Sequence, residues 1–200
     1  MHTEEGYKIY DEMEFWRNDT FESIIEFCWF DVSNCESLTC IPAELLNLKF
    51  LRRLNLGGCL KLEELPEIEE TMENLKVLIL DETAIKELLS SSLHHLVGLE
   101  ELSLRNCKQL KTIPSSIGNL SKLLKLDLTY CVSLETFPNS IFRLKLTKLH
   151  LRGCSMLSTF PEIPSNIGRL SSLTKISLQG SSILNLPKSM AHLSSLKSLK

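Results

Sequence analysis

The sequence predicts an α/β solenoid, in which successive turns of the chain each add one short strand to a parallel sheet. The sheet is expected on the concave side of a horseshoe, and irregular or short-helical segments on the convex side. Two observations predict this fold. A frame of apolar residues recurs about every 24 residues, and a proline closes most copies of that frame.

The frame is clearest in one copy, which reads Leu51-x-x-Leu54-x-Leu56-x-x-Cys59-x-x-Leu62-x-x-Leu65-Pro66. Copies start at positions 27, 51, 75, 99, 123, 146, 173 and 196, so that the steps are 24, 24, 24, 24, 23, 27 and 23 residues. Steps of about 20–29 residues with this frame are the signature of leucine-rich repeats. The long step accommodates an insertion at residues 162–165.

The repeats divide the chain into two parts. Residues 21–200 are assigned to a leucine-rich-repeat domain of about seven repeats, which is truncated inside a further copy at its C-terminal end. Phe21 and Ile24 set its start, because they match the phase of Leu45 and Leu48 one repeat later. Residues 1–20 match no repeat and are expected to form a separate N-terminal segment.

Each position of the frame has a structural role. The Leu-x-Leu pair predicts a strand that alternates between the core and the solvent, and such strands stack about 4.8 Å apart. Seven of them would give a concave sheet about 29 Å long. The proline after each frame ends strand pairing, because it has no N–H group. The segment that follows, such as residues 115–120, is expected to cover the convex side.

Composition and charge exclude several classes of function. A net charge of −3 and a pI near 6.0 give no reason to expect a nucleic-acid partner or an anionic membrane. No run of 18 or more apolar residues predicts a membrane span. The acidic N-terminus does not resemble a secretory signal, so we expect a reducing compartment, the cytoplasm or the nucleus.

Five cysteines occupy one repeat position, directly after the strand, where two other copies have Thr83 and Ser181 instead. They are Cys35, Cys59, Cys107, Cys131 and Cys154. A small polar side chain at this position can bond the free backbone of the turn, which favours a structural role and reduced thiols. A metal or redox role is the alternative, but no pair has the Cys-x-x-Cys spacing of a zinc site.

Nothing in the sequence predicts an enzyme or a cofactor. The phosphate-binding loop, the Gly-x-Ser-x-Gly elbow and the His-Glu-x-x-His zinc motif are all missing. The neighbouring His94 and His95 do not share a ligand face, because adjacent residues diverge on a helix or a strand. We therefore expect no catalytic residue, no cofactor and no metal.

The informative positions are the strand residues expected to face outward on the concave side. Three columns of such residues run across the predicted strands, and the C-terminal half of these columns is rich in basic side chains. The candidate protein-binding residues there are Arg105, Lys125, Asp127, Lys148, His150, Arg152 and Lys175.

Lys125, Lys148 and Lys175 fall in the same column, one strand apart. Like charges about 4.8 Å apart repel, so such a column is unfavourable unless an acidic group pairs with it. The alternative is a solvated face whose long side chains splay apart. Asp127, in the neighbouring column, is expected to be exposed, so that Asp127→Ala should matter far less than truncation of the inward-facing Leu126.

The repeats closely resemble those of plant intracellular nucleotide-binding leucine-rich-repeat disease-resistance proteins. The resemblance rests on LGGCLKLEELP at 56–66, LRNCKQLKTIPSSIGNL at 104–120 and LRGCSMLSTFP at 151–161. The shorter copy, LDETAIKEL at 80–88, is similar to the alternate repeat of the class that carries a Toll/interleukin-1-receptor domain. Plant extracellular receptors differ, since their repeats favour Asn where this chain has Cys.

This resemblance implies the recognition part of an immune receptor. Its protein partner would be a pathogen effector, a guarded host protein or the receptor's own nucleotide-binding domain, which it would help to hold inactive. The Toll-like and nucleotide-binding domains are missing from these 200 residues, so the chain resembles a fragment. The alternative is an intracellular leucine-rich-repeat scaffold without an immune role.

Overall fold

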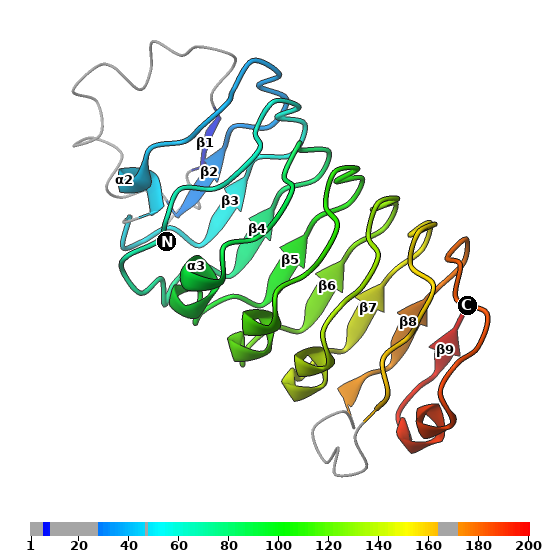
Figure 1. The fold of residues 1–200 in the computed structure, drawn as a ribbon. Helices are drawn as coiled ribbons and strands as arrows, with labels where there is room; N and C mark the ends of the chain where they lie inside the picture. Colours follow the sequence, from blue (N-terminus) through cyan, green and yellow to red (C-terminus); the bar gives the residue numbers. More distant parts are fainter. Residues whose placement is uncertain (1–5, 9–27, 47, 164–171) are drawn as a thin grey trace.

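The computed structural model describes residues 6–8, 28–46, 48–163 and 172–200. Over these residues the chain forms one open sheet in which every strand pairs in parallel with the next strand along the sequence (Figure 1). The predicted α/β solenoid of leucine-rich repeats is confirmed. The strands are β1 Gly6–Lys8, β2 Trp29–Asp31, β3 Arg53–Asn55, β4 Val77–Ile79, β5 Glu101–Ser103, β6 Lys125–Asp127, β7 Lys148–His150, β8 Lys175–Ser177 and β9 Ser198–Leu199.

The central residue of each strand from β2 to β8 points into the core, as the alternation predicts. Leu126 in β6 and Leu102 in β5 are completely buried and lie opposite each other in the register. The apolar residue two positions later, Leu128 in β6, is also buried. Stacking these side chains across successive turns gives one continuous apolar core along the solenoid.

Short helical segments form a second row that runs along the sheet (Figure 1). They are α2 Ala43–Leu46, α3 Ser90–His95, η2 Ser115–Asn119, η3 Asn139–Arg143 and η5 Lys188–His192. A proline immediately precedes each of the three 3-10 segments: Pro114, Pro138 and Pro187. Its fixed φ and missing N–H suit the position before a helical turn, which explains how the Leu-Pro step redirects the chain.

The described sheet has nine strands, two more than the repeats predict. β9 comes from the unfinished last copy of the frame. β1 comes from the segment that the sequence assigns outside the repeats, and it pairs with β2 through Tyr7 and Phe30. The rest of residues 1–20, the match at Phe21 and Ile24, and residues 164–165 of the insertion lie outside the described residues, so the boundary at residue 20 stays a prediction.

Four cysteine side chains connect neighbouring turns of the solenoid. The thiols of Cys59, Cys107, Cys131 and Cys154 donate to carbonyl oxygens of the preceding turn, over 3.0–3.2 Å. Thr83, the substitute in a shorter repeat, donates to the Leu80 carbonyl at 2.8 Å. The predicted structural role of this position is therefore confirmed, and all seven cysteines of the chain are free thiols.

Burial makes these thiols poor nucleophiles. It raises the pKa of Cys59 and of Cys154 to about 12 and that of Cys107 to about 11, from an ordinary value of 9.0. Burial also raises the pKa of Cys131 strongly. Because the thiolate is the form that binds metals and attacks disulfides, this environment favours the structural role over a redox role.

A backbone conformation with positive φ recurs in the turn after each of the strands β2–β8. Gly58, Gly153 and Gly180 adopt it, and so do Asn34, Glu82, Asn106 and Tyr130. Glycine and asparagine tolerate this region, whereas a bulky side chain such as that of Tyr130 adopts it at a cost. The turn therefore has one backbone conformation, and most repeats place Gly or Asn at its positive-φ position.

Candidate protein-binding site

The three lysines that the sequence places in one column do lie side by side. Lys125 in β6 is opposite Lys148 in β7, and Lys148 is opposite Lys175 in β8. His150 lies opposite both Asp127 and Ser177 in the neighbouring column. The register thus brings six of the seven candidate residues onto three adjacent strands or the turns directly after them.

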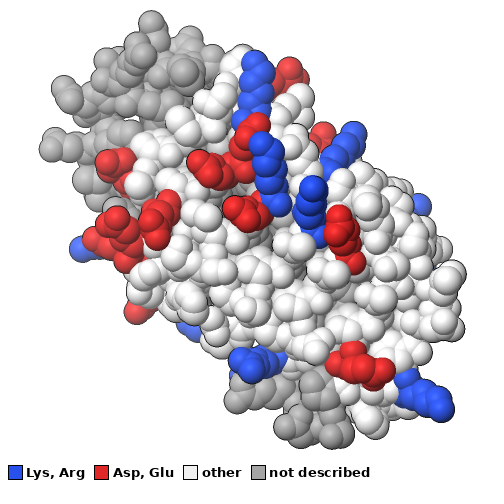
Figure 2. Space-filling view, viewed as in Figure 1, with Lys and Arg blue, Asp and Glu red and all other residues white. Residues whose placement is uncertain are grey.

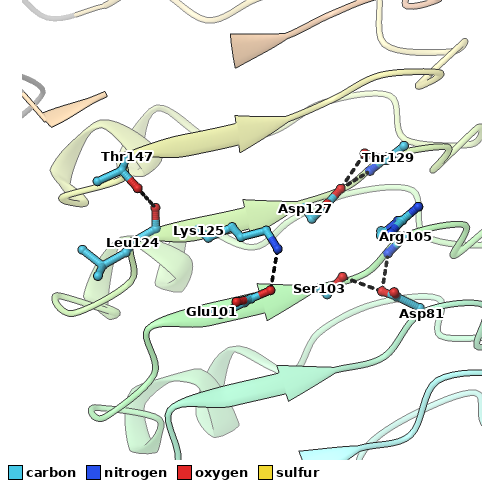
Figure 3. A network of polar contacts seen from close by, with 9 residues as sticks. All are labelled: Asp81, Glu101, Ser103, Arg105, Leu124, Lys125, Asp127, Thr129 and Thr147. Carbon is cyan, nitrogen blue, oxygen red and sulfur yellow. Dashed lines mark hydrogen bonds and ion pairs between the residues drawn. The ribbon is translucent and has the colours of Figure 1, made fainter. Parts of the chain in front are cut away.

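Lys125 is not a free cation, because it pairs with an acidic residue of its own column. Its Nζ lies 2.5 Å from Oε1 of Glu101, which stands one strand earlier (Figure 3). Both side chains are about one-third exposed. The repulsion expected among three lysines is therefore reduced to that between Lys148 and Lys175.

The expectation that Asp127 is exposed is wrong. Its side chain is only 7% exposed, because Oδ1 accepts hydrogen bonds from the backbone N–H of Thr129 at 3.1 Å and from the Thr129 hydroxyl (Figure 3). The carboxylate caps the turn that follows β6. Asp127 is thus a structural residue, and a carboxylate with these partners cannot be counted as an open contact position.

Arg105 belongs to a further internal network. Oδ1 of Asp81 accepts hydrogen bonds from the Ser103 hydroxyl at 2.6 Å and from the Arg105 backbone N–H at 2.9 Å (Figure 3). Burial raises the pKa of Asp81, while the bond from Ser103 and the bond and charge of Arg105 oppose that shift. The positive charge of the Arg105 side chain also acts on Asp81, although the two form no ion pair in the described structure, so Arg105 is in part compensated by a carboxylate of the same chain.

Four candidate residues remain, and we name them the open strip: Lys148, His150, Arg152 and Lys175. Within the part of the chain that the structure describes, the side chains of Lys148, Arg152 and Lys175 have no ion pair or hydrogen bond to another residue. The His150 Nε2 atom is buried and has no hydrogen-bond partner. The strip therefore carries polar capacity that the fold leaves unused.

The charges around His150 show how the strip is built. Burial is the largest influence and lowers the pKa of His150, and the positive charges of Lys175, Lys125 and Lys148 lower it further. Asp127 alone opposes the shift. At neutral pH the imidazole is therefore mainly neutral and can either donate or accept, while Lys148, Lys175 and Arg152 supply the positive charge.

Elsewhere on the molecule, basic side chains lie among acidic ones. Figure 2 shows Lys and Arg side chains beside Asp and Glu side chains in the upper part of the face in view, while much of the rest of that face is uncharged. Lys86 pairs with Glu63 at 2.5 Å, and Lys76 with Glu100 at 3.1 Å. The open strip differs from such surfaces because the carboxylate whose charge acts on His150, Asp127, is already bonded to Thr129, and no described acidic side chain forms an ion pair with Lys148, Arg152 or Lys175.

Sequence reasoning missed one residue that extends the strip. The Tyr130 ring is 45% exposed, and the Arg152 guanidinium lies 5.7 Å from its centroid. The signal was available, because Tyr130 occupies the turn position where most repeats have Gly or Asn. An aromatic residue there is directed to the surface and not to the core.

The described residues show no centre for metal or membrane chemistry. No group of three or more His, Cys, Asp or Glu side chains among them is arranged to hold a metal ion. No helix in the described ranges is long and apolar enough to cross a membrane.

Comparisons with known proteins agree with the fold. The Leucine Rich Repeat family matches residues 98–120. The leucine-rich repeat domain of the type III effector XopL superposes with a TM-score of 0.69 at 34% identity, over 82% of this chain and 57% of that one. The Leptospira interrogans protein LIC12759 gives 0.62 at 23% identity, over 95% of this chain and 51% of that one, and supports the fold alone.

The repeats, the sheet and the ladder of buried thiols define a leucine-rich-repeat solenoid. Among such proteins, this chain is a relative of plant disease-resistance proteins. It is 32% identical to the Disease resistance-like protein DSC1 of Arabidopsis thaliana over 90% of its length, and 41% identical to the Disease resistance protein RPP5 of the same plant over 68%. It spans only 13% and 11% of those two proteins.

Proposed function

We propose that this chain is the protein-recognition part of a plant immune receptor, and that its open strip contacts an acidic surface of the partner. The partner is a pathogen effector, a guarded host protein or the receptor's own nucleotide-binding domain. The chain acts by binding, without catalysis and without a cofactor, in the cytoplasm or the nucleus. The names of the relatives support the immune role, and the leucine-rich-repeat fold supports a role in protein binding.

The observation that carries the site is the contrast within one column of the concave face. Glu101 and Lys125 neutralise each other, whereas Lys148 and Lys175 stand side by side without an acidic partner among the described residues. Two adjacent lysines do not stabilise the sheet, because like charges on neighbouring strands repel. An acidic partner surface would remove that repulsion, and charge complementarity of this kind sets partner choice and association rate.

The test reverses the charge of the strip in the gene itself. Plants that carry Lys148→Glu together with Lys175→Glu are challenged with a pathogen that the unmodified gene recognises. We expect either loss of the defence response or a response without any pathogen. Loss identifies a recognition contact, and a spontaneous response identifies a contact that holds the receptor inactive.

The matched control changes charge by the same amount elsewhere. Lys108→Glu with Lys111→Glu replaces two exposed lysines. Both follow Cys107 in the sequence and lie outside the strands of the sheet. This pair should behave as the unmodified gene does. If the strip variant responds normally to the pathogen and shows no response without it, the proposal is overturned. The strip would then be a solvated face without a partner. A chain that bound partners normally with no defence phenotype would instead be a scaffold without an immune role.

A further inference from the structure

The turn after β6 has an exposed aromatic residue at a position where the repeat requires only a positive φ. Tyr130 has a φ of 62°, in the left-handed region that bulky residues avoid. Its ring is nearly half exposed, so that much of its apolar surface contributes little to the core. Five of the seven described turns solve the same backbone problem with Gly or Asn, so the fold itself does not demand an aromatic residue there.

The next turn leaves room for this ring. A Cβ atom on Gly153 would lie 2.2 Å from Cδ1 of Tyr130, so that any larger residue at 153 would displace the ring. Gly153 also has a φ of 74°, which suits glycine. The two turns are tied together by a backbone hydrogen bond of 2.6 Å from the Tyr130 N–H to the Arg152 carbonyl. The Tyr130 ring thus packs at a defined position against Gly153.

Arg152 places its guanidinium over that ring, 5.7 Å from the centroid. A cation within about 6 Å of an aromatic centroid is attracted to the ring face. An arginine held near a ring face in this way has fewer orientations for its planar set of N–H donors, so that less conformational entropy is lost when it binds a carboxylate. Since no described acidic residue pairs with Arg152, those donors remain available.

The position of Arg152 relates this pair to the open strip. Lys148 and His150 alternate along β7, about 6–7 Å apart, and Arg152 lies two residues further on, in the turn after the strand. Lys175 flanks Lys148 on the next strand. Two cations, Lys148 and Arg152, thus stand on either side of the neutral His150, with Tyr130 beside the arginine.

We propose that Tyr130 positions Arg152 for two-pronged binding of a carboxylate, so that this pair is the specific anchor for an acidic segment of the partner protein. The inference rests on the proposed function and deepens it, because it separates two roles within the strip. Lys148 and Lys175 attract acidic chains through charge alone. Arg152 selects the planar carboxylate through its donor geometry, and Tyr130 is a positioning residue that acts through Arg152.

The test measures binding of a fluorescent hexaglutamate peptide to the 200-residue chain by anisotropy at low salt. Arg152→Lys keeps the charge but removes the planar donors, and should weaken binding about five- to tenfold. Tyr130→Asn suits the left-handed turn, yet it should weaken binding about two- to fivefold because the ring no longer orients the arginine. Tyr130→Phe keeps the ring and should bind as the unmodified chain does.

The combination of Tyr130→Asn with Arg152→Lys should be no weaker than Arg152→Lys alone, because the ring acts only through the guanidinium. Two controls repeat the same chemistry elsewhere. Arg53→Lys changes an exposed arginine of β3, and Glu82→Asn relieves the same backbone cost in another turn. Both should leave binding unchanged.

The outcomes separate this inference from the broader proposal. If Lys148→Glu with Lys175→Glu abolishes binding of hexaglutamate while Arg152→Lys and Tyr130→Asn do not weaken it, the anchor is overturned and the charged strip stands. Additive losses in the double variant, or failure of Tyr130→Phe to bind normally, overturn the positioning role. Absence of saturable hexaglutamate binding also overturns the inference, and the pathogen challenge then decides the proposed function separately.

Discussion

Strands β2–β6 and strands β7–β8 are built from the same repeat, but their concave faces differ in how polar side chains are satisfied. In β2–β6 several polar side chains bond to one another, as Asn55 does to Asp31 and Lys125 to Glu101. In β7–β8 the side chains of the open strip have no such partners among the described residues. The comparison indicates that the proposed binding surface differs from the other strands in its unused bonding capacity more than in its charge.

If the two regions share one interior, their buried thiols should be equally unreactive. Burial raises the pKa of both Cys59 and Cys154 to about 12. Each should therefore have about a thousandfold less thiolate than an ordinary thiol and should resist a thiol reagent at pH 8. Mass spectrometry after brief alkylation of the native chain checks this, with the exposed Cys40 as the reactive control.

The unfolded chain should titrate all seven cysteines. Fast alkylation of Cys154 beside slow alkylation of Cys59 would show that the interior under β7 is looser, and the comparison would then concern packing and not the surface alone.

Core truncation should affect both regions equally. Leu54 in β3 and Leu149 in β7 are both essentially unexposed. Each Leu→Ala change should lower the free energy of unfolding by about 2–5 kcal/mol, because it removes buried methyl groups and leaves a cavity. Urea denaturation followed by circular dichroism measures the loss. A much smaller loss for Leu149→Ala would contradict a common core.

Surface truncation should separate the two regions. Asp127→Ala leaves the Thr129 N–H and hydroxyl without their acceptor, and should cost about 1–3 kcal/mol. Lys148→Ala removes no bond and relieves repulsion with Lys175, so its effect should stay within about 0.5 kcal/mol. The same denaturation assay compares the two. Equal losses in the free energy of unfolding would show that polar side chains of β7 bond within the fold as much as those of β6 do.

The smallest effect concerns His150 and pH. Burial is the main reason why its pKa in the folded chain lies below 6.5, the ordinary value that the unfolded chain retains. As the pH falls through 6.5 and below, the unfolded chain takes up protons first, so the stability of the fold decreases. His150→Gln should remove part of this decrease between pH 7.5 and 5.5, measured by urea midpoints. His192→Gln, on η5, is the control and should retain it.

The apolar period predicted the strands and their phase because each turn repeats one packing problem. Leu126 and Leu128 lie in the core as the frame requires. The additional strand β1 also leaves a trace in the sequence, since Tyr7 and Ile9 stand two residues apart, 23 residues before Phe30 and Val32. Tyr7 and Ile9 alone, without a leucine, were too weak a pattern to predict a further repeat.

The sequence predicted which residues of the candidate site align across the strands. It did not predict which of these side chains stay exposed and unbonded. The alignment of Lys125 with Lys148 follows from the period alone, and so does the place of Glu101 in the same column. Which neighbours bond depends on side-chain reach and on the shape of the turn, and the turn at Thr129 is what buries Asp127. Local hydrogen bonds of this kind compete with exposure and are not visible in an apolar frame.

The thiol ladder also has a mechanical consequence. Cys59 bonds the Val32 carbonyl and Cys131 bonds the Leu104 carbonyl, so each thiol joins its own turn to the one before it. Together with the parallel strand pairing, these bonds lie in series along the solenoid, and a pull on the two ends loads every junction with the same force. Because each turn contacts only its neighbours, the weakest junction opens first and its loss relaxes the remainder. Under tension the chain should lengthen in steps, each of which corresponds to the unfolding of about one repeat.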